Sequence, residues 1–267
     1  MNRLPSALAV LAAVAASLPS LRADAAAAAP AAPAVTVTAT PSFVSQYMFR
    51  GYRIGGPAFE PEIEADAGNL AVGVWGNFPI ADPVPGQSDP EIDPYASYTV
   101  SVNDKLSLIP GIQIYTYPNT DVGDGNFRAT VEPNFAVSTS LGPVKLTPKI
   151  YYDVVLRSTT LELNAAASAP LKAIGSELDF TGTYGGYLAD NWVNTGAAGG
   201  PDTRAWGAYW LAGVSMPFQI PYAGTLSIGY AYTQGFDSGT KLGSLPEQPN
   251  PQTAGRSVWT VSLAHTF

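Results

Sequence analysis

The segment that most constrains the fold is residues 256–267, in which large or apolar residues alternate with small or polar ones. The large members are Trp259, Val261, Leu263, His265 and Phe267. A repeat of two residues is the period of a β-strand, because successive side chains point to opposite faces of a sheet. The sequence therefore predicts a strand here with one mostly apolar face, ending on an aromatic residue.

Similar alternation, bounded by turn residues, recurs along the chain. Most segments reach the roughly 9 to 11 residues that a tilted transmembrane strand needs. Short turns alternate with longer connections at 51–57, 80–89, 118–126, 189–203 and 237–255, apart from one tight turn near Arg157. An even number of strands with this loop asymmetry predicts an all-β fold, an antiparallel up-and-down transmembrane β-barrel of about 12 strands, rather than a secreted β-sandwich. The predicted strands are 42–50, 58–67, 69–79, 90–102, 105–117, 127–141, 144–156, 159–169, 176–188, 204–217, 224–236 and 256–267.

The amino-terminal residues 1–25 have the form of a cleaved secretory signal peptide. A basic residue, Arg3, precedes an apolar run, and a small-x-small site ends at Ala25. No segment approaches the ~20 apolar residues of a transmembrane helix. Residues 26–41, rich in Ala and Pro, are predicted to be a disordered leader, which leaves residues 42–267 for the barrel. An exported chain without a transmembrane helix is predicted to reside in the bacterial outer membrane.

The composition agrees with a barrel whose outer face meets lipid. Only 13% of the residues are charged, against ~25% in ordinary soluble domains, while aromatic residues reach 11%. There is no Cys, so disulfides do not hold the fold together. Removal of residues 1–25 leaves 13 − 2 = 11 basic and 21 − 1 = 20 acidic residues, a net charge of −9. Such an acidic chain is a poor candidate for binding nucleic acid.

The alternation also assigns a lipid face and a lumen face to each strand. In 144–156, for example, Ile150 and Tyr152 fall on the apolar face and Lys149 and Tyr151 on the polar one. Prolines inside predicted strands fall on the lipid face, where we expect bulges or bends. They are Pro61, Pro94, Pro110, Pro133 and Pro148.

Two segments carry a family resemblance. Ser45-Gln46-Tyr47-Met48-Phe49-Arg50-Gly51 and Gly73-Val74-Trp75-Gly76-Asn77 resemble the opening of Gcw_chp, a bacterial outer-membrane family of unknown function, in which a Ser-x-Tyr-x-Phe-Arg-Gly strand precedes a Gly-x-Trp strand. Glu60-Pro61-Glu62 departs from that family's usual second strand. The resemblance implies an exported barrel and adds no catalytic residue.

Charged residues at lumen-facing positions are the candidates for lining the lumen and setting its selectivity. Carboxylates on the second and fourth strands face basic residues on the sixth and seventh, which predicts a transverse field and a weak cation preference. The candidates are Arg50, Glu60, Glu62, Glu64, Asp66, Glu91, Asp93, Arg128, Glu132, Lys145, Lys149, Asp153 and Arg157.

Other chemistry is not favoured. Alternate residues of one strand stand about 6.5 to 7 Å apart, too far to cage Ca²⁺ alone, so the ladder from Glu60 to Asp66 is interpreted as a solvated wall and no metal is predicted. One His, no Cys and no Gly-x-Ser-x-Gly motif leave no catalytic residue, and we predict neither an enzyme nor a cofactor. A sugar-stacking lane is less favoured than lumen filling for Tyr115, Tyr117, Tyr151 and Tyr209.

The sequence therefore predicts a narrow porin-like channel for small solutes or ions. The alternative is a non-conducting structural barrel that docks periplasmic cell-wall proteins. The expected partners are outer-membrane lipid and, during insertion, the barrel-assembly machinery. The alternating residues from Trp259 to Phe267 form the expected insertion signal.

Overall fold

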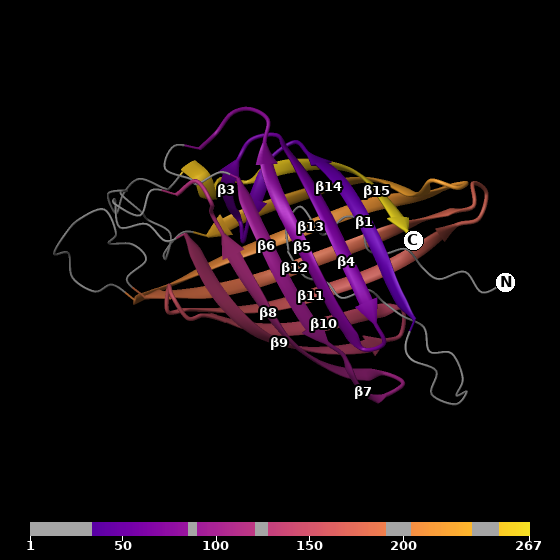
Figure 1. Cartoon of the computed structure of the whole chain (residues 1–267), viewed down its shortest axis with the longest axis horizontal. Helices are drawn as coiled ribbons and strands as arrows, with labels where there is room; N and C mark the ends of the chain where they lie inside the picture. The colour runs from indigo at the N-terminus through magenta and orange to yellow at the C-terminus, as the bar shows by residue number, and fades with distance from the viewer. Residues whose placement is uncertain (1–33, 85–89, 121–127, 191–203, 237–250) are drawn as a thin grey trace.

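The computed structural model describes residues 34–84, 90–120, 128–190, 204–236 and 251–267. Within these ranges, twelve strands form one closed antiparallel ring, and Figure 1 shows them tilted around a common interior. The predicted signal peptide and residues 26–33 of the predicted leader lie outside the described residues. The fold class predicted from alternation is confirmed.

The ring is built from strands in chain order. They are β1 (Val35–Val44), β4 (Ala58–Ala67), β5 (Leu70–Pro79), β6 (Glu91–Tyr98), β8 (Leu106–Thr116), β9 (Ala129–Leu141), β10 (Val144–Asp153), β11 (Ser158–Leu171), β12 (Ser176–Asp190), β13 (Arg204–Ile220), β14 (Gly224–Phe236) and β15 (Arg256–Thr266). β7 (Val100–Asn103) continues β6 beyond Thr99 and also pairs with β8. A 3₁₀ turn, η3 (Pro251–Thr253), precedes β15.

Each strand pairs with its neighbours in sequence, and two further pairings complete the circle. β6 pairs with β8 through Tyr95 and Gln113, and β1 pairs with β15 through Thr38 and Thr266. No sheet edge therefore remains in the described part of the ring, which satisfies the requirement that backbone groups in lipid be hydrogen-bonded.

The predicted strands correspond closely to the observed ones, with one correction at the start. The first strand runs over Val35–Val44 instead of 42–50, so it begins inside the segment assigned to the leader. Residues 47–55 form a separate two-stranded sheet, β2 (Tyr47–Phe49) with β3 (Tyr52–Gly55). The prediction was wrong there because a short inner hairpin alternates in the same way as a membrane strand.

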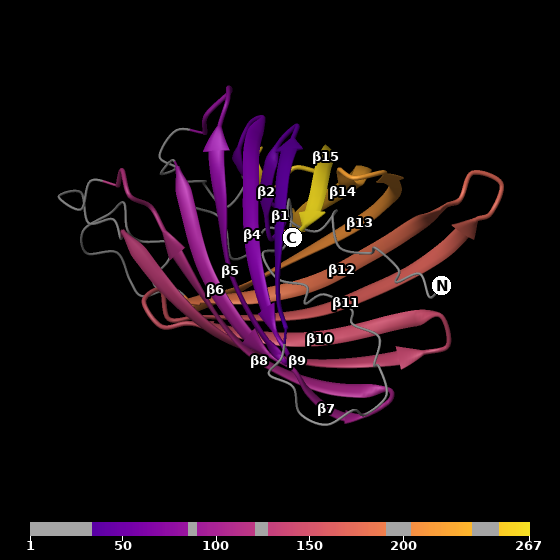
Figure 2. The same cartoon turned by 45° about the vertical axis from the view of Figure 1, so that its right-hand side comes forward.

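The connections give the barrel two unlike ends. The short turns between β4 and β5, β9 and β10, β11 and β12, and β13 and β14 share one end with the start of β1 and the end of β15 (Figure 2). We call this the short-turn end and the opposite one the long-loop end. Most of the long connections predicted at 80–89, 118–126, 189–203 and 237–255 lie outside the described residues.

The two faces of the wall are inverted relative to a soluble protein. The outward side chains of Phe135, Ile150 and Leu163 are exposed, whereas inward Glu132 and Thr147 are buried. Apolar residues outside and polar residues inside are the pattern of a transmembrane barrel. Trp206 and Trp259 are exposed on the outside, but Trp75 is buried inside the barrel.

The in-strand prolines do not produce the expected bulges. Around Pro61 the β4–β5 ladder omits pairs between Phe59 and Glu62, yet the register is the same on both sides, and Pro148 behaves likewise in the β9–β10 ladder. An antiparallel ladder can lose one N–H and keep its alignment, since the flanking pairs are independent.

No helix in the described ranges is long and apolar enough to cross a membrane.

A charge on the outer face tests the inverted pattern. Leu163 lies midway along β11 and is 49% exposed. We expect Leu163→Arg to lower the free energy of unfolding from lipid vesicles by about 2–4 kcal/mol, measured by denaturant titration. Thr181→Arg, on the inner face of β12, is the matched control. Equal losses for the two variants would contradict the assigned lipid face.

Candidate functional site

The interior of the barrel is crossed by a hairpin that leaves the wall between β1 and β4. This inner hairpin comprises residues 45–57 and contains β2 and β3. Its turn residues, Arg50 and Gly51, have φ angles of 49° and 76°. Two successive positive φ angles define the tight type I′ turn of a two-residue hairpin, a conformation that Gly adopts freely and Arg does not. Arg50 therefore occupies a strained position at the tip.

The base of the inner hairpin is fixed to the wall by apolar and polar contacts. Val44, Met48, Ala58 and Val258 form a fully buried apolar cluster. Ser45 donates its backbone N–H to the carbonyl of Trp259 at 2.9 Å, next to this cluster. These contacts hold the hairpin base against β1, β4 and β15.

Arg53 of β3 adds a polar contact at the base. Its guanidinium pairs with the Asp82 carboxylate and donates to the side-chain oxygen of Gln46 at 3.2 Å. Asp82 is 73% exposed, so this ion pair meets solvent.

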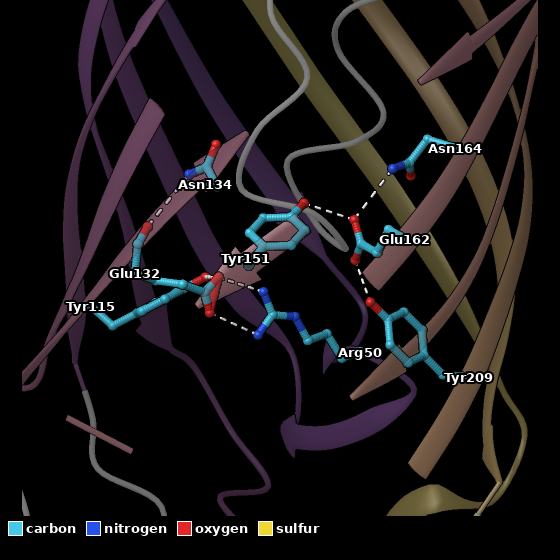
Figure 3. Close-up of polar contacts among 8 residues, drawn as sticks. All are labelled: Arg50, Tyr115, Glu132, Asn134, Tyr151, Glu162, Asn164 and Tyr209. Atoms are coloured by element: carbon cyan, nitrogen blue, oxygen red, sulfur yellow. Dashed lines mark hydrogen bonds and ion pairs between the residues drawn. The ribbon is translucent and has the colours of Figure 1, made fainter. Parts of the chain in front are cut away.

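The tip of the inner hairpin reaches the far wall. Arg50 donates two hydrogen bonds to the carboxylate of Glu132 on β9, at 2.9 Å and 2.6 Å (Figure 3). Its guanidinium also lies 4.8 Å from the ring centre of Tyr151 on β10. Because the pair is bidentate and the Glu132 side chain is only 2% exposed, it is a strong, oriented contact.

The other side of the tip presses on β13 and β14. A Cβ atom added to Gly51 would stand 2.5 Å from the Cβ of Tyr209 and 2.8 Å from the Cα of Gly235. Only glycine fits so close an approach. Contacts with β9 on one side and with β13 and β14 on the other mean that the hairpin tip crosses the lumen.

A second carboxylate lies beside this crossing. Glu162 of β11 accepts hydrogen bonds from Tyr151 at 2.7 Å and from Tyr209, and from Asn164 at 3.3 Å (Figure 3). Lys149 lies 4.5 Å from the ring centre of Tyr151. Both Glu132 and Glu162 are thus matched by donors, as burial requires.

We call this layer the constriction. It is the level at which side chains from the hairpin tip and from five wall strands meet, and its members are buried or nearly so. They are Arg50, Tyr115, Glu132, Tyr151, Glu162 and Tyr209.

Toward the short-turn end, inward charged side chains are less buried than in the constriction. Glu62 and Glu64 of β4 accept hydrogen bonds from Tyr95 at 2.5 Å and 2.9 Å, and they are partly exposed. Asp66 and Lys145 are also partly exposed, further toward that end. This half of the lumen is therefore wetter than the constriction.

Most of the sequence-predicted lumen residues point inward, but two do not line the wall. Arg157 is exposed in the turn between β10 and β11, and Arg128 is exposed just before β9, donating to the carbonyl of Thr120 at 3.2 Å. The inward ones are Arg50, Glu60, Glu62, Glu64, Asp66, Glu91, Asp93, Glu132, Lys145, Lys149 and Asp153.

The predicted transverse field needs acidic and basic residues on opposite sides of the lumen, and the structure has this arrangement in part. β4 with its carboxylates and β10 with Lys145 and Lys149 are separated by four strands one way round the ring and six the other, so they lie nearly opposite. Glu132, Asp153 and Glu162 nevertheless add negative charge on the basic side.

Sequence reasoning missed Glu162, and it did not place Arg50 on an inner hairpin. An available signal was Arg50-Gly51 between two aromatic residues, since a dipeptide ending in Gly between alternating residues favours a two-residue turn. His265 lies near the end of β15. Its Nδ1 lies 3.0 Å from the carbonyl oxygen of Ala223, and its ring packs on Phe267.

Comparison with known protein families finds a match over most of the chain. The model of the bacterial protein family of unknown function Gcw_chp matches residues 27–267. No curated protein sequence matches the chain.

Among solved structures, the chain is similar to outer-membrane porins. The NanC porin aligns with a TM-score of 0.48 and 10% identity over 85% of this chain and 98% of that one. The KdgM porin, solved with disordered oligogalacturonate, aligns with a TM-score of 0.48 and 10% identity over 87% and 99%. OprD from Pseudomonas aeruginosa aligns with a TM-score of 0.38 and 11% identity over 78% and 59%.

A double-mutant cycle tests the contact across the lumen. Arg50→Gln or Glu132→Gln alone leaves a buried charge without its partner, so each should lower the unfolding free energy by about 3 kcal/mol, and the double variant by less than the sum. Denaturant titration in lipid vesicles measures all four proteins. Asp82→Asn, which removes the exposed carboxylate of the pair with Arg53, should cost less than about 1 kcal/mol. Strict additivity of the two single losses would contradict a direct contact.

Proposed function

The chain belongs to the Gcw_chp family of bacterial proteins of unknown function, and we propose that its barrel is a narrow porin-like channel of the bacterial outer membrane. It passes small solutes or ions and weakly prefers cations. The support is the closed ring with an apolar exterior and a charged interior, a combination found in barrels that span this membrane. The predicted signal peptide and the alternating residues of β15, from Trp259 to Phe267, fit export and insertion by the barrel-assembly machinery.

The observation that carries the proposal is the excess of carboxylates facing the lumen. Glu62, Glu64 and Asp66 form a partly exposed ladder along β4, while Lys145 is the half-exposed base nearest the same end. A narrow pore with fixed negative charge concentrates cations and repels anions. Barrels of about eight strands are filled by side chains and those of sixteen or more hold wide channels, so twelve strands suit small solutes.

A second function is favoured by one specific feature. The constriction is filled by buried side chains in mutual hydrogen bonds. A barrel permanently closed at this level would be a structural element that docks periplasmic cell-wall proteins. Electrical recording separates the two functions.

Planar-bilayer recording of the refolded mature chain tests conduction and its sign. We expect steady single-channel steps and a reversal potential of the sign for cation preference under a salt gradient. Replacing both Glu62 and Glu64 with Gln should move that potential toward zero, whereas Asp104→Asn, in the exposed turn between β7 and β8, should leave it nearly unchanged. Anion preference would contradict the proposal, and silence from protein shown to be folded and inserted would favour the structural barrel.

Shortening the inner hairpin tests its part in the constriction. Replacing residues 46–55 with a short Gly-Ser connection removes Arg50 and its contact with Glu132. We expect the single-channel conductance to rise several-fold, because channel conductance follows the narrowest cross-section. The variant should keep its cation preference, since the β4 ladder is untouched. An unchanged conductance would show that the hairpin does not limit the flow.

A further inference from the structure

The tip of the inner hairpin, residues 49–52, touches nearly opposite sides of the wall. The ring of Phe49 packs edge-on against Tyr115 of β8, with 5.7 Å between centroids, and Gly51 lies against Tyr209 of β13. β8 and β13 are five strands apart one way round the ring of twelve and seven the other. Both tyrosines are buried. In this structure the hairpin tip therefore lies across the path of a solute moving along the lumen.

The hairpin is attached to the wall differently at its base and at its tip. At the base, the backbone N–H of Ser45 donates to the carbonyl of Trp259 at 2.9 Å, and the carbonyl of Pro57 accepts from the N–H of Ile80 at 2.8 Å. At the tip, the contacts are ring packing, the ion pair of Arg50 and the close approach of Gly51. Contacts of the second kind can break without opening the wall, because they are not part of its ladder of backbone hydrogen bonds.

A register shift in the hairpin marks a place where the tip can bend. Tyr47 pairs with Gly55 and Met48 pairs with Arg53, so Ile54 has no residue opposite it. An extra residue of this kind interrupts the ladder and bends the strand locally. The wall contacts of Tyr47 lie on the base side of the shift, and the tip lies beyond it. The register shift therefore separates an anchored base from a tip held by side chains.

The wall holds a second cation beside the one on the tip. Arg50 and Lys149 both lie over the ring of Tyr151, at 4.8 Å and 4.5 Å from its centroid. Lys149 stands opposite Glu162 in the β10–β11 register. Its ammonium is attracted by the charges of Glu162 and Glu132 and repelled by that of Arg50.

This second cation changes the cost of withdrawing the tip. A buried carboxylate that loses its only positive partner is strongly destabilised. When Arg50 leaves Glu132, however, its repulsion of Lys149 ends and the Lys149 ammonium can turn toward the same carboxylate. The constriction thus contains a replacement for the ion pair that holds the tip in place.

We propose that the hairpin tip is a gate, closed in this structure, that opens when Arg50 withdraws from Glu132 and Lys149 pairs with that carboxylate instead. The tip bends toward the long-loop end, because the hairpin connects the end of β1 with the start of β4 there. The gate rests on the proposed channel and describes how that channel is regulated.

The open probability of single channels in planar bilayers separates a gate from a simple change of lumen charge. Arg50→Gln removes the cation that holds the closed state and should raise the open probability at least threefold. Lys149→Gln removes the replacement cation and should lower it at least threefold. Each variant loses one positive charge from the same layer, so a pure charge effect would change both in one direction, and that result would overturn the gate. Lys105→Gln, in the exposed turn between β7 and β8, is the control and should change the open probability less than twofold.

Cross-linking tests the movement of the tip directly. The chain has no Cys, so Phe49→Cys with Tyr115→Cys places the only two thiols where the two rings meet. Bridging them with a propyl bis-methanethiosulfonate should lower the open probability at least tenfold, and dithiothreitol should restore it. Propyl methanethiosulfonate, which adds bulk without a bridge, should have less than a twofold effect. The control pair is Ala166→Cys with Thr181→Cys, opposite one another on β11 and β12, where a bridge should change nothing. An unchanged open probability after bridging of the tip, or an equal loss with the single-ended reagent, would overturn the gate.

A distance measurement that needs no current distinguishes failure of the gate from failure of the channel. Spin labels on Tyr52→Cys and Asp104→Cys, in the refolded full mature chain in lipid vesicles, report the position of the tip relative to the short-turn end. Double electron–electron resonance should give two distances, with the longer one more populated when Arg50→Gln is added. A single distance that Arg50→Gln leaves unchanged would overturn the gate, whether or not current flows. Two distances in a protein that passes no current would contradict only the channel.

Discussion

The constraint on which this structure depends is that backbone N–H and C=O groups in lipid find partners within the protein. A sheet satisfies this only when it has no edge, so the two ends of the chain must meet. The pairing of β1 with β15 provides that closure. Once the ring is closed, the outward side chains are free to be apolar and the inward ones polar, which is why exposed Leu163 and buried Glu162 can follow one another on β11.

The inner hairpin is not part of that ring. Its two strands pair only with each other, and they are joined to the wall mainly at the base and through side chains at the tip. The strands of the wall satisfy the backbone hydrogen bonds that lipid requires, whereas the hairpin places a charged side chain inside the lumen. A charged side chain there needs donors and acceptors of its own, and the pair of Arg50 with Glu132 meets that need. The strain of Arg50 in a left-handed conformation is held by this pair and by the close contact of Gly51 with Tyr209.

Much of the wall could be predicted from the sequence, because period two is a local property that survives wherever one face is apolar. The predicted segments 58–67 and 224–236 coincide with β4 and β14. The inner hairpin could not be separated from a membrane strand, since Tyr47 and Phe49 alternate with their neighbours in the same way.

The contacts inside the lumen were even less accessible to sequence reasoning. Arg50 and Glu132 are 82 residues apart, and their contact exists only because the hairpin tip crosses the barrel. Similarly, alternation indicates that Glu60 and Asp93 face inward, but strand register decides that they share one wall. Neighbouring residues in the sequence indicate whether a charged side chain points inward, but they do not indicate which distant residue it contacts.

The pairing of β1 with β15 also determines when the barrel can close during folding. Thr38 and Thr266 meet across it although 228 residues separate them, and such a distant contact is slow to form because a long loop must close first. β1 precedes β15 in synthesis, so one of its edges stays unpaired until β15 has been made. An open strand edge is a template for aggregation, so the chain is most exposed to aggregation before β1 and β15 pair.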